Sequence, residues 1–183
     1  MRKFYFKYIG EVFVLYRGQQ LDDIVPQIEV KTEILPLYSL DKQVVEKIID
    51  LEGRLSFLYL RFVFGSAETY LALAWVGEQL VHIGWITPSK RCRRFPFIPE
   101  KAYMIGPCQT APSFRGNRIF PFVLQQISRS LPGCDEYWIC TNEKNLASIR
   151  GIEKAGARHV GRFVRKKWLW GRLTSTKYYP DES

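Results

Sequence analysis

Histidine and methionine are scarce in this sequence of 183 residues, which has 2 of each and only 4 cysteines. No cysteine belongs to a CxxC pair, and no histidine cluster lies near one. Structural zinc sites need such clusters, so we expect no metal site. The cysteines are then expected to be free thiols in a reducing cytoplasm. They are Cys92, Cys108, Cys134 and Cys140.

Long apolar runs are also missing. No stretch is long and apolar enough to span a bilayer, and residues 1–17 lack the features of a signal peptide. We therefore expect no membrane span and a cytoplasmic protein.

Acidic residues are outnumbered, with 18 Asp and Glu against 27 Lys and Arg, a net charge of +9. This balance suits an anionic partner: nucleic acid, a membrane surface or a phosphate-rich small molecule. The basic residues gather at Lys90–Arg94 and Arg158–Arg172, which form either a binding site or two solvated surfaces.

Apolar residues are abundant, at 46% hydrophobic and 15% aromatic, so the chain can bury a proper core. Its length suits one domain over residues 1–183. Aromatic and β-branched residues at 4–16 predict a strand, or a hairpin interrupted at Gly10. Prolines predict a loop over 22–38, and apolar spacing predicts a helix over 39–51 that Gly53 ends.

Further along, Leu55–Phe64 fits either a buried strand or a helix. The clearest hairpin joins Glu68–Val76 to Leu80–Ile86. An exposed loop over Pro88–Pro99 and a strand over Ala102–Thr110 are expected next.

After a loop that contains glycine, apolar residues at helical spacing predict a helix that begins at about Ile119. A short strand over 136–140, a helix over 142–156 and a final sheet portion over 157–164 and 175–179 are expected to follow.

A strand that runs into a glycine-containing loop and then a helix leaves backbone N–H groups unpaired at one spot. The positive end of the helix dipole lies behind them, so such a spot binds phosphate. The run TAPSFRGNRIFPFVLQQI, residues 110–127, has this order.

This run resembles the pyrophosphate-binding segment of the GNAT acyltransferases, approximately V-x-P-x-x-R-G-x-G-x-G before a long helix. The run NLASIRGIEKAGARHVGRF, residues 145–163, is similar to the family's second signature. The matching residues are Thr110, Pro112, Arg115 and Gly116 in the first motif, and Asn145, Ser148, Lys154 and Gly156 in the second. With the preceding hairpin, the resemblance covers roughly residues 55 to 180.

The resemblance implies an α/β fold with a mixed, mostly antiparallel central sheet, splayed at the cofactor site and flanked by helices. It also implies acetyl-CoA, or another acyl-CoA, as cofactor, and direct attack of a small-molecule amine on the thioester. The residues expected at the cofactor are Cys108, Thr110, Arg115, Gly116, Asn117, Arg118, Ile119, Phe120, Asn145 and Ser148.

Some positions depart from the family pattern. Arg118 and Phe120 stand where glycine or alanine is usual, so cofactor contact is looser or Arg118 adds a phosphate partner. Ile152 replaces a tyrosine thought to protonate the leaving thiolate, so that role does not transfer. Ala157 replaces the common phenylalanine, which we interpret as a change in core packing.

The candidate catalytic residues, which would remove the proton from the substrate amine, are His82, Glu78 and Tyr103. A histidine has a suitable pKa, but a lone one in an apolar hairpin also fits a packed core residue. Glu78 alternatively belongs to a turn, and Tyr103 to the core. Cys108, beside the loop, fits a buried thiol better than a nucleophile.

The acceptor hypothesis is a nucleotide-linked amino sugar, as in surface-polysaccharide synthesis, with Arg93 and Arg94 meeting its phosphates. A nucleic-acid-binding module is an alternative because aromatic and basic residues mix at Trp168–Arg172, but no recognised binding motif is present. A CoA-binding GNAT domain without catalysis is another. The sequence gives no basis for an oligomeric state.

Overall fold

The computed structural model describes residues 9–18, 23–91, 98–99, 102–131, 137–168 and 173–180. The strands are β1 (Ile9–Gly18), β2 (Lys31–Pro36), β3 (Tyr70–Val76), β4 (Gln79–Pro88), β5 (Tyr103–Thr110), β6 (Tyr137–Asn142), β7 (Arg158–Trp168) and β8 (Leu173–Pro180). The α-helices are α1 (Lys42–Glu52), α2 (Arg54–Phe64), α3 (Ile119–Ser130) and α4 (Leu146–Lys154). Short 3-10 turns cover Leu37–Ser39, Ser89–Arg91 and Pro112–Phe114.

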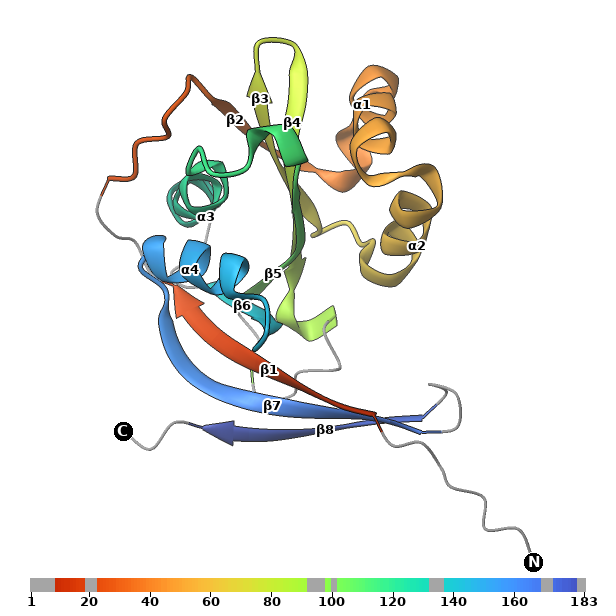
Figure 1. Cartoon of the computed structure of the whole chain (residues 1–183). Helices are drawn as coiled ribbons and strands as arrows, with labels where there is room; N and C mark the ends of the chain where they lie inside the picture. Colours follow the sequence, from red (N-terminus) through yellow and green to blue (C-terminus); the bar gives the residue numbers. More distant parts are fainter. Residues whose placement is uncertain are drawn as a thin grey trace, which may run out of the picture.

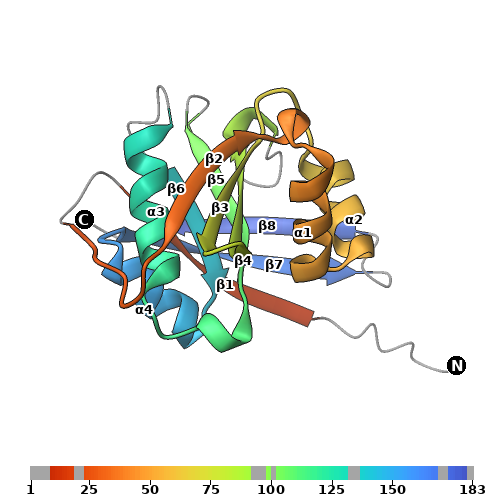
Figure 2. The same cartoon turned by 90° about the horizontal axis from the view of Figure 1, so that it is seen from above.

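The strands form one mixed sheet in the order β2-β3-β4-β5-β6-β1-β7-β8, as expected for this fold class. Every neighbouring pair is antiparallel except β5 and β6, which are parallel. Helices α1 and α2 lie on one side of the sheet and α3 and α4 on the other (Figures 1 and 2). The parallel pair therefore lies in the middle of a three-layer arrangement.

Several sequence predictions are confirmed. In β1, Gly10 is paired with Lys166 and does not break the strand. The helix predicted over 39–51 is α1, whose first turn is capped by the Asp41 side chain and whose end is Gly53. The segment left open between strand and helix is α2, with Phe57 and Leu60 buried on one face.

The loop predicted over 22–38 is partly wrong, because β2 lies inside it and pairs with β3. The prolines misled the prediction. Pro36 stands at the last position of a strand at the sheet edge, where a missing N–H breaks no ladder bond in the interior.

The helix predicted over 142–156 is also shorter than expected. Asn142 is the last residue of β6, and its side chain accepts a hydrogen bond from the Lys144 N–H at 3.0 Å. Asn145 then caps α4 by accepting from the Ser148 N–H at 3.2 Å. Local side-chain bonds of this kind compete with helix, which explains the later start.

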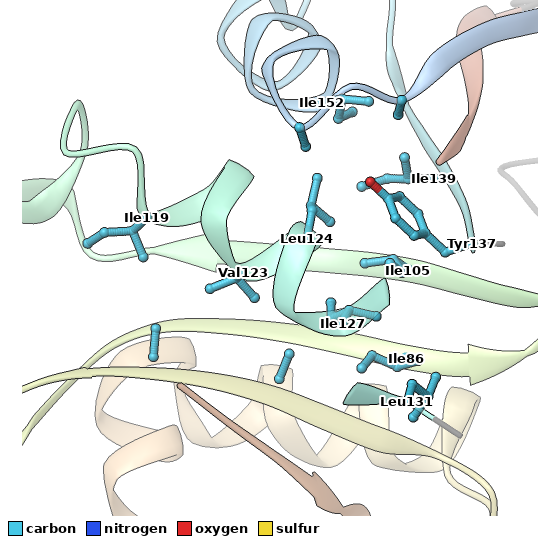
Figure 3. Packing of buried hydrophobic residues seen from close by; sticks show 14 of the residues in the cluster. Ile86, Ile105, Ile119, Val123, Leu124, Ile127, Leu131, Tyr137, Ile139 and Ile152 are labelled. Atoms are coloured by element: carbon cyan, nitrogen blue, oxygen red, sulfur yellow. The ribbon is translucent and has the colours of Figure 1, made fainter. Parts of the chain in front are cut away.

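Two large apolar clusters hold the layers together. One fills the space between the sheet and helices α3 and α4, where Ile105, Val123, Leu124 and Ile152 meet (Figure 3). The other lies under α1 and α2 around Trp85. Ile152 is fully buried and Ala157 is 6% exposed, so these two of the four positions that depart from the family pattern are packing positions.

Among the helices that the structure describes, none has the length and apolar character to cross a membrane. Within the same residues, no group of His, Cys, Asp and Glu is placed to hold a metal ion.

Candidate active site

The two parallel strands separate in the middle of the sheet. β5 and β6 are paired from Tyr103 and Tyr137 to Ile105 and Ile139, and no later pair joins these described strands. The β4–β5 register shifts at this point, opposite Gly106 and Pro107. Pro107 has no N–H to donate to a neighbouring strand, and Gly106 has φ 125°, which favours glycine. These two residues direct the end of β5 away from β6.

The loop after β5 delivers the start of α3 into the opening. Arg115 Nε donates to the Thr110 carbonyl at 3.2 Å, and Gly116 takes φ 89°. Arg118 precedes α3 in the left-handed region, with φ 61° and no side-chain cap for the helix. The first N–H groups of an α-helix have no partner within the helix, so they are available to an anion here.

A cavity of about 760 Å³ lies at this opening. Its walls come from the end of β5, the loop 111–118, the start of α3 and one face of α4. The lining residues are His82, Cys108, Gln109, Thr110, Phe114, Arg115, Gly116, Arg118, Ile119, Phe120, Pro121, Asn145, Ala147, Ser148, Arg150, Gly151 and Lys154.

The lining is positively charged. It includes Arg115, Arg118, Arg150 and Lys154, and none of the described residues on its wall is Asp or Glu. Arg115, Arg118, Arg150 and Lys154 are all exposed, so their cationic groups remain hydrated and available. Four cations with an uncapped helix start fit an elongated ligand that carries several phosphates.

His82 lies at the inner end of the cavity and is 1% exposed. Its Nδ1 forms a hydrogen bond of 2.7 Å with Thr110 Oγ1, while the buried Nε2 has no hydrogen-bond partner among the described residues. Burial lowers the pKa of His82 to about 3. The imidazole is therefore neutral near pH 7, when it can exchange hydrogen bonds but accepts a proton poorly.

Cys108 is half-buried beside His82 and directly opposite Gly84 in the β4–β5 pairing. Burial raises the pKa of the Cys108 thiol to about 12, with a further contribution from the Glu52 carboxylate. A thiol in this state is neither a nucleophile nor a proton acceptor near pH 7.

Most of the residues expected at the cofactor are brought together around this cavity: Cys108, Thr110, Arg115, Gly116, Arg118, Ile119, Phe120, Asn145 and Ser148. Asn117 is absent from the lining. The side-chain amide of Asn117 donates to the Phe114 carbonyl at 3.2 Å, and the backbone carbonyl of Asn117 accepts from the Gln27 N–H at 3.1 Å.

The other catalytic candidates lie apart from His82. Glu78 is exposed in the β3–β4 turn and does not line the cavity. Tyr103 starts β5, at the end opposite Thr110, and its ring contacts Tyr70 edge-on at 6.5 Å. Arg93 and Arg94 fall outside the described residues. Lys90, from the same basic loop, forms an ion pair with Glu68 at 2.6 Å.

Sequence reasoning missed the contribution of α4 beyond Asn145 and Ser148. Ala147, Arg150, Gly151 and Lys154 all line the cavity. They are spaced by three, one and three residues, which places them on one helix face. That spacing, in a helix that follows the expected phosphate loop, was the available signal.

Comparison with solved structures finds the same fold elsewhere. An acetyltransferase of the GNAT family from Colwellia psychrerythraea superposes with a TM-score of 0.58 at 18% identity, covering 89% of this chain and 57% of that one. The fold is that of the GNAT proteins. A GCN5-related N-acetyltransferase from Sphaerobacter thermophilus matches with a TM-score of 0.55 at 17% identity, covering 88% of this chain and 53% of that one.

A functionally unknown conserved protein from Staphylococcus epidermidis also matches, with a TM-score of 0.59 at 11% identity over 85% of this chain and 60% of that one. The chain thus spans little more than half the length of these structures. No protein-family model matches the sequence, and no curated protein does. Similarity at these identities concerns the GNAT fold, and function has to be argued from the cavity.

Proposed function

We propose that this chain is an acyl-CoA-dependent N-acyltransferase that transfers an acyl group, most simply acetyl, to a small amine. The observation that carries the proposal is the cationic cavity where β5 and β6 separate, with the uncapped start of α3 on its wall. The GNAT fold supports it, because acetyltransferases of that fold are among the structures it resembles.

Acetyl-CoA suits the chemistry of the cavity. Its pyrophosphate would meet the backbone of Arg115 to Phe120, at the loop and the start of α3 that line the cavity. The Arg115 N–H already donates to the Pro112 carbonyl at 3.3 Å, so Arg115 would contribute its guanidinium group. Arg150 and Lys154 add cations on the opposite wall for a further phosphate. When bound, acetyl-CoA supplies an activated acyl group as a thioester.

The chain itself provides position and polarity. The end of β5, Cys108–Thr110, has no pairing with β6, so its backbone can orient the thioester carbonyl. His82 lines the same cavity, and its buried Nε2 has no hydrogen-bond partner in the part of the chain that the structure describes. As a neutral group it is suited to hydrogen bonding with that carbonyl, with Thr110 Oγ1 holding the ring in place. No enzyme nucleophile is required, in keeping with the high pKa of the Cys108 thiol.

The acceptor we favour is an amino sugar linked to a nucleotide. This rests on the basic loop with Arg93 and Arg94, whose cations suit the diphosphate of such a molecule. A screen of nucleotide-linked amino sugars, free amino sugars, polyamines and peptide N-termini with acetyl-CoA tests it. Charge reversal at Arg93 and Arg94 should lower kcat/KM for the best acceptor. Unchanged kcat/KM, or a best acceptor without negative charge, would contradict this choice.

The central test is binding of acetyl-CoA, followed by turnover. Isothermal titration should give binding in the micromolar range, and the melting temperature should rise with ligand concentration. Neither heat nor stabilisation at millimolar acetyl-CoA would overturn the proposal. Binding without release of free CoA thiol, across the amine screen, would assign the chain to a non-catalytic CoA-binding domain. Tight, salt-sensitive binding of nucleic acid without any acetyl-CoA effect would favour a nucleic-acid module.

A further inference from the structure

Glu52 is a carboxylate held on the side of the sheet away from the cationic cavity. It ends α1, and its Oε1 accepts a hydrogen bond from the Trp85 indole Nε1 at 3.1 Å. Its other oxygen, Oε2, is buried and has no hydrogen-bond partner among the described residues. A buried carboxylate oxygen without a donor is costly, so its retention calls for a functional explanation.

Glu52 nevertheless lies close to the inner end of the cavity. Gln109, which lines the cavity, donates from its side chain to the Leu51 carbonyl at 2.6 Å and so fixes the end of α1 against β5. The Glu52 carboxylate also acts electrostatically on the Cys108 thiol, another lining residue. β5 thus has the cavity on one side and the Glu52 carboxylate on the other, at the point where it has left β6.

From this geometry we infer that Glu52 Oε2 accepts the proton of the acceptor amine. The inference rests on the proposed acyltransfer and adds a catalytic residue to the same reaction centre. The amine would supply the hydrogen-bond donor that Oε2 lacks, and a carboxylate binds a cationic amine well.

The neighbours of Glu52 agree with this role. β4 presents the Trp85 indole, which does not titrate and packs against Phe57 of α2 with ring centroids 6.0 Å apart, and β5 presents the Cys108 thiol. Burial raises the pKa of Glu52, and the hydrogen bond from Trp85 lowers it by less. A raised pKa brings a carboxylate closer to that of an amine and makes it a better acceptor of the amine proton.

The step balances as follows. The amine nitrogen forms a bond to the acyl carbon, the carbon–sulfur bond breaks, and the sulfur keeps its electron pair. The bound ammonium group loses two protons on becoming an amide. Glu52 accepts the first, which frees the nitrogen lone pair for attack, and later releases it to solvent; the second goes through solvent to the leaving sulfur. His82 and Cys108 are poor alternatives, because burial lowers the pKa of the imidazole to about 3, which makes it a weak base, and keeps the thiol protonated.

A first experiment needs no substrate. Because the Trp85 indole N–H donates to Glu52, its NMR signal reports protonation of that carboxyl group. In the wild-type protein the signal should titrate with a midpoint above the ordinary value of 4.5, and in Glu52→Gln it should not. A signal that moves equally in both proteins would show that Glu52 does not titrate there and would overturn the inference.

The second experiment measures acyl transfer and acyl-CoA binding together. Glu52→Gln keeps an oxygen for the Trp85 hydrogen bond, so the fold should persist. We expect kcat with the best amine to fall about 100-fold or more, with the Kd for acetyl-CoA unchanged. Glu46→Gln, an exposed position on the same helix, is the matched control and should retain activity.

The outcomes separate the two proposals. If wild type binds acetyl-CoA and transfers the acyl group, but Glu52→Gln retains kcat within about threefold, the role of Glu52 is wrong and the acyltransferase stands. If wild type transfers to no amine, the acyltransferase is wrong and the role of Glu52 falls with it. A large loss in Glu52→Gln alone, with acetyl-CoA binding intact, supports both.

Discussion

The ring of Phe120 at the start of α3 lies directly against Gly151 in α4. A Cβ atom on residue 151 would lie 2.6 Å from Phe120 Cδ1, closer than side chains approach. Phe120 stands where GNAT proteins usually have a small residue, and Gly151 supplies the space for it. The ring also lies 5.8 Å from the His82 ring, so this contact shapes the inner part of the cavity.

Gly151→Ala should therefore destabilise the protein by about 1–3 kcal/mol through overpacking. The sign is informative, because glycine to alanine inside a helix otherwise stabilises by up to about 1 kcal/mol. Urea unfolding measures the effect. In a Phe120→Ala background the same substitution should be neutral or stabilising. An equal loss in both backgrounds would show that the two residues are not coupled.

Arg118 combines a charge with an unfavourable backbone conformation, at φ 61°. Arg118→Gly and Arg118→Ala remove the same cation, so both should weaken acetyl-CoA binding by about tenfold, or 1.4 kcal/mol. They should differ in stability, because glycine adopts this conformation without the cost of about 1 kcal/mol that alanine pays. Titration calorimetry and unfolding curves test the two effects separately. Equal stabilities, or binding unchanged in both, would contradict one half of the prediction.

His82 should make the protein less stable in mild acid. Its pKa is lowered from 6.5 to about 3 in the folded state, so below about pH 6.5 the unfolded chain binds a proton that the folded chain does not. Stability contributed by the neutral ring is complete above that pH and is lost as the pH falls, by about 1.4 kcal/mol per unit. Between about pH 7 and pH 5, the free energy of unfolding of the wild type should fall by this amount per pH unit relative to that of His82→Asn. Parallel pH profiles would show that the ring is not protected from protonation.

Asn145 has two possible roles that a pair of variants separates. It caps α4 and also lines the cavity. Asn145→Ala should cost about 1 kcal/mol of stability and raise KM for acetyl-CoA about tenfold, near 1.4 kcal/mol. Asn145→Ser restores the cap without the amide. If serine restores stability but not KM, the amide contacts the cofactor; if kinetics never change in a folded variant, Asn145 is only a cap.

Local patterns were enough for much of the fold. The β3–β4 hairpin, α1 with its Asp41 cap, α3 and the final strands follow from apolar spacing and from turn and cap residues that act within a few positions. The loop before α3 was predicted from its glycine and from the order strand, loop, helix, and its role in binding phosphate stays a prediction. Two predictions were wrong, at β2 and at the start of α4. Pro36 is tolerated in β2 because that strand lies at the sheet edge, and Asn145 caps α4 from outside the helix. Neither effect can be read from the residue type alone.

The sequence by itself determined the GNAT resemblance, the cationic loop before α3 and most of the residues expected at the cofactor. Only the tertiary structure decided which side chains share a cavity and how each is charged. Burial makes His82 a neutral group, and the packing of α1 against β4 and β5 brings Glu52 to Trp85 and Cys108. Glu52 and Cys108 are far apart along the chain, so no local pattern predicts their proximity. The pKa of His82 depends on burial by every layer around the ring, so no local pattern predicts its neutral state either.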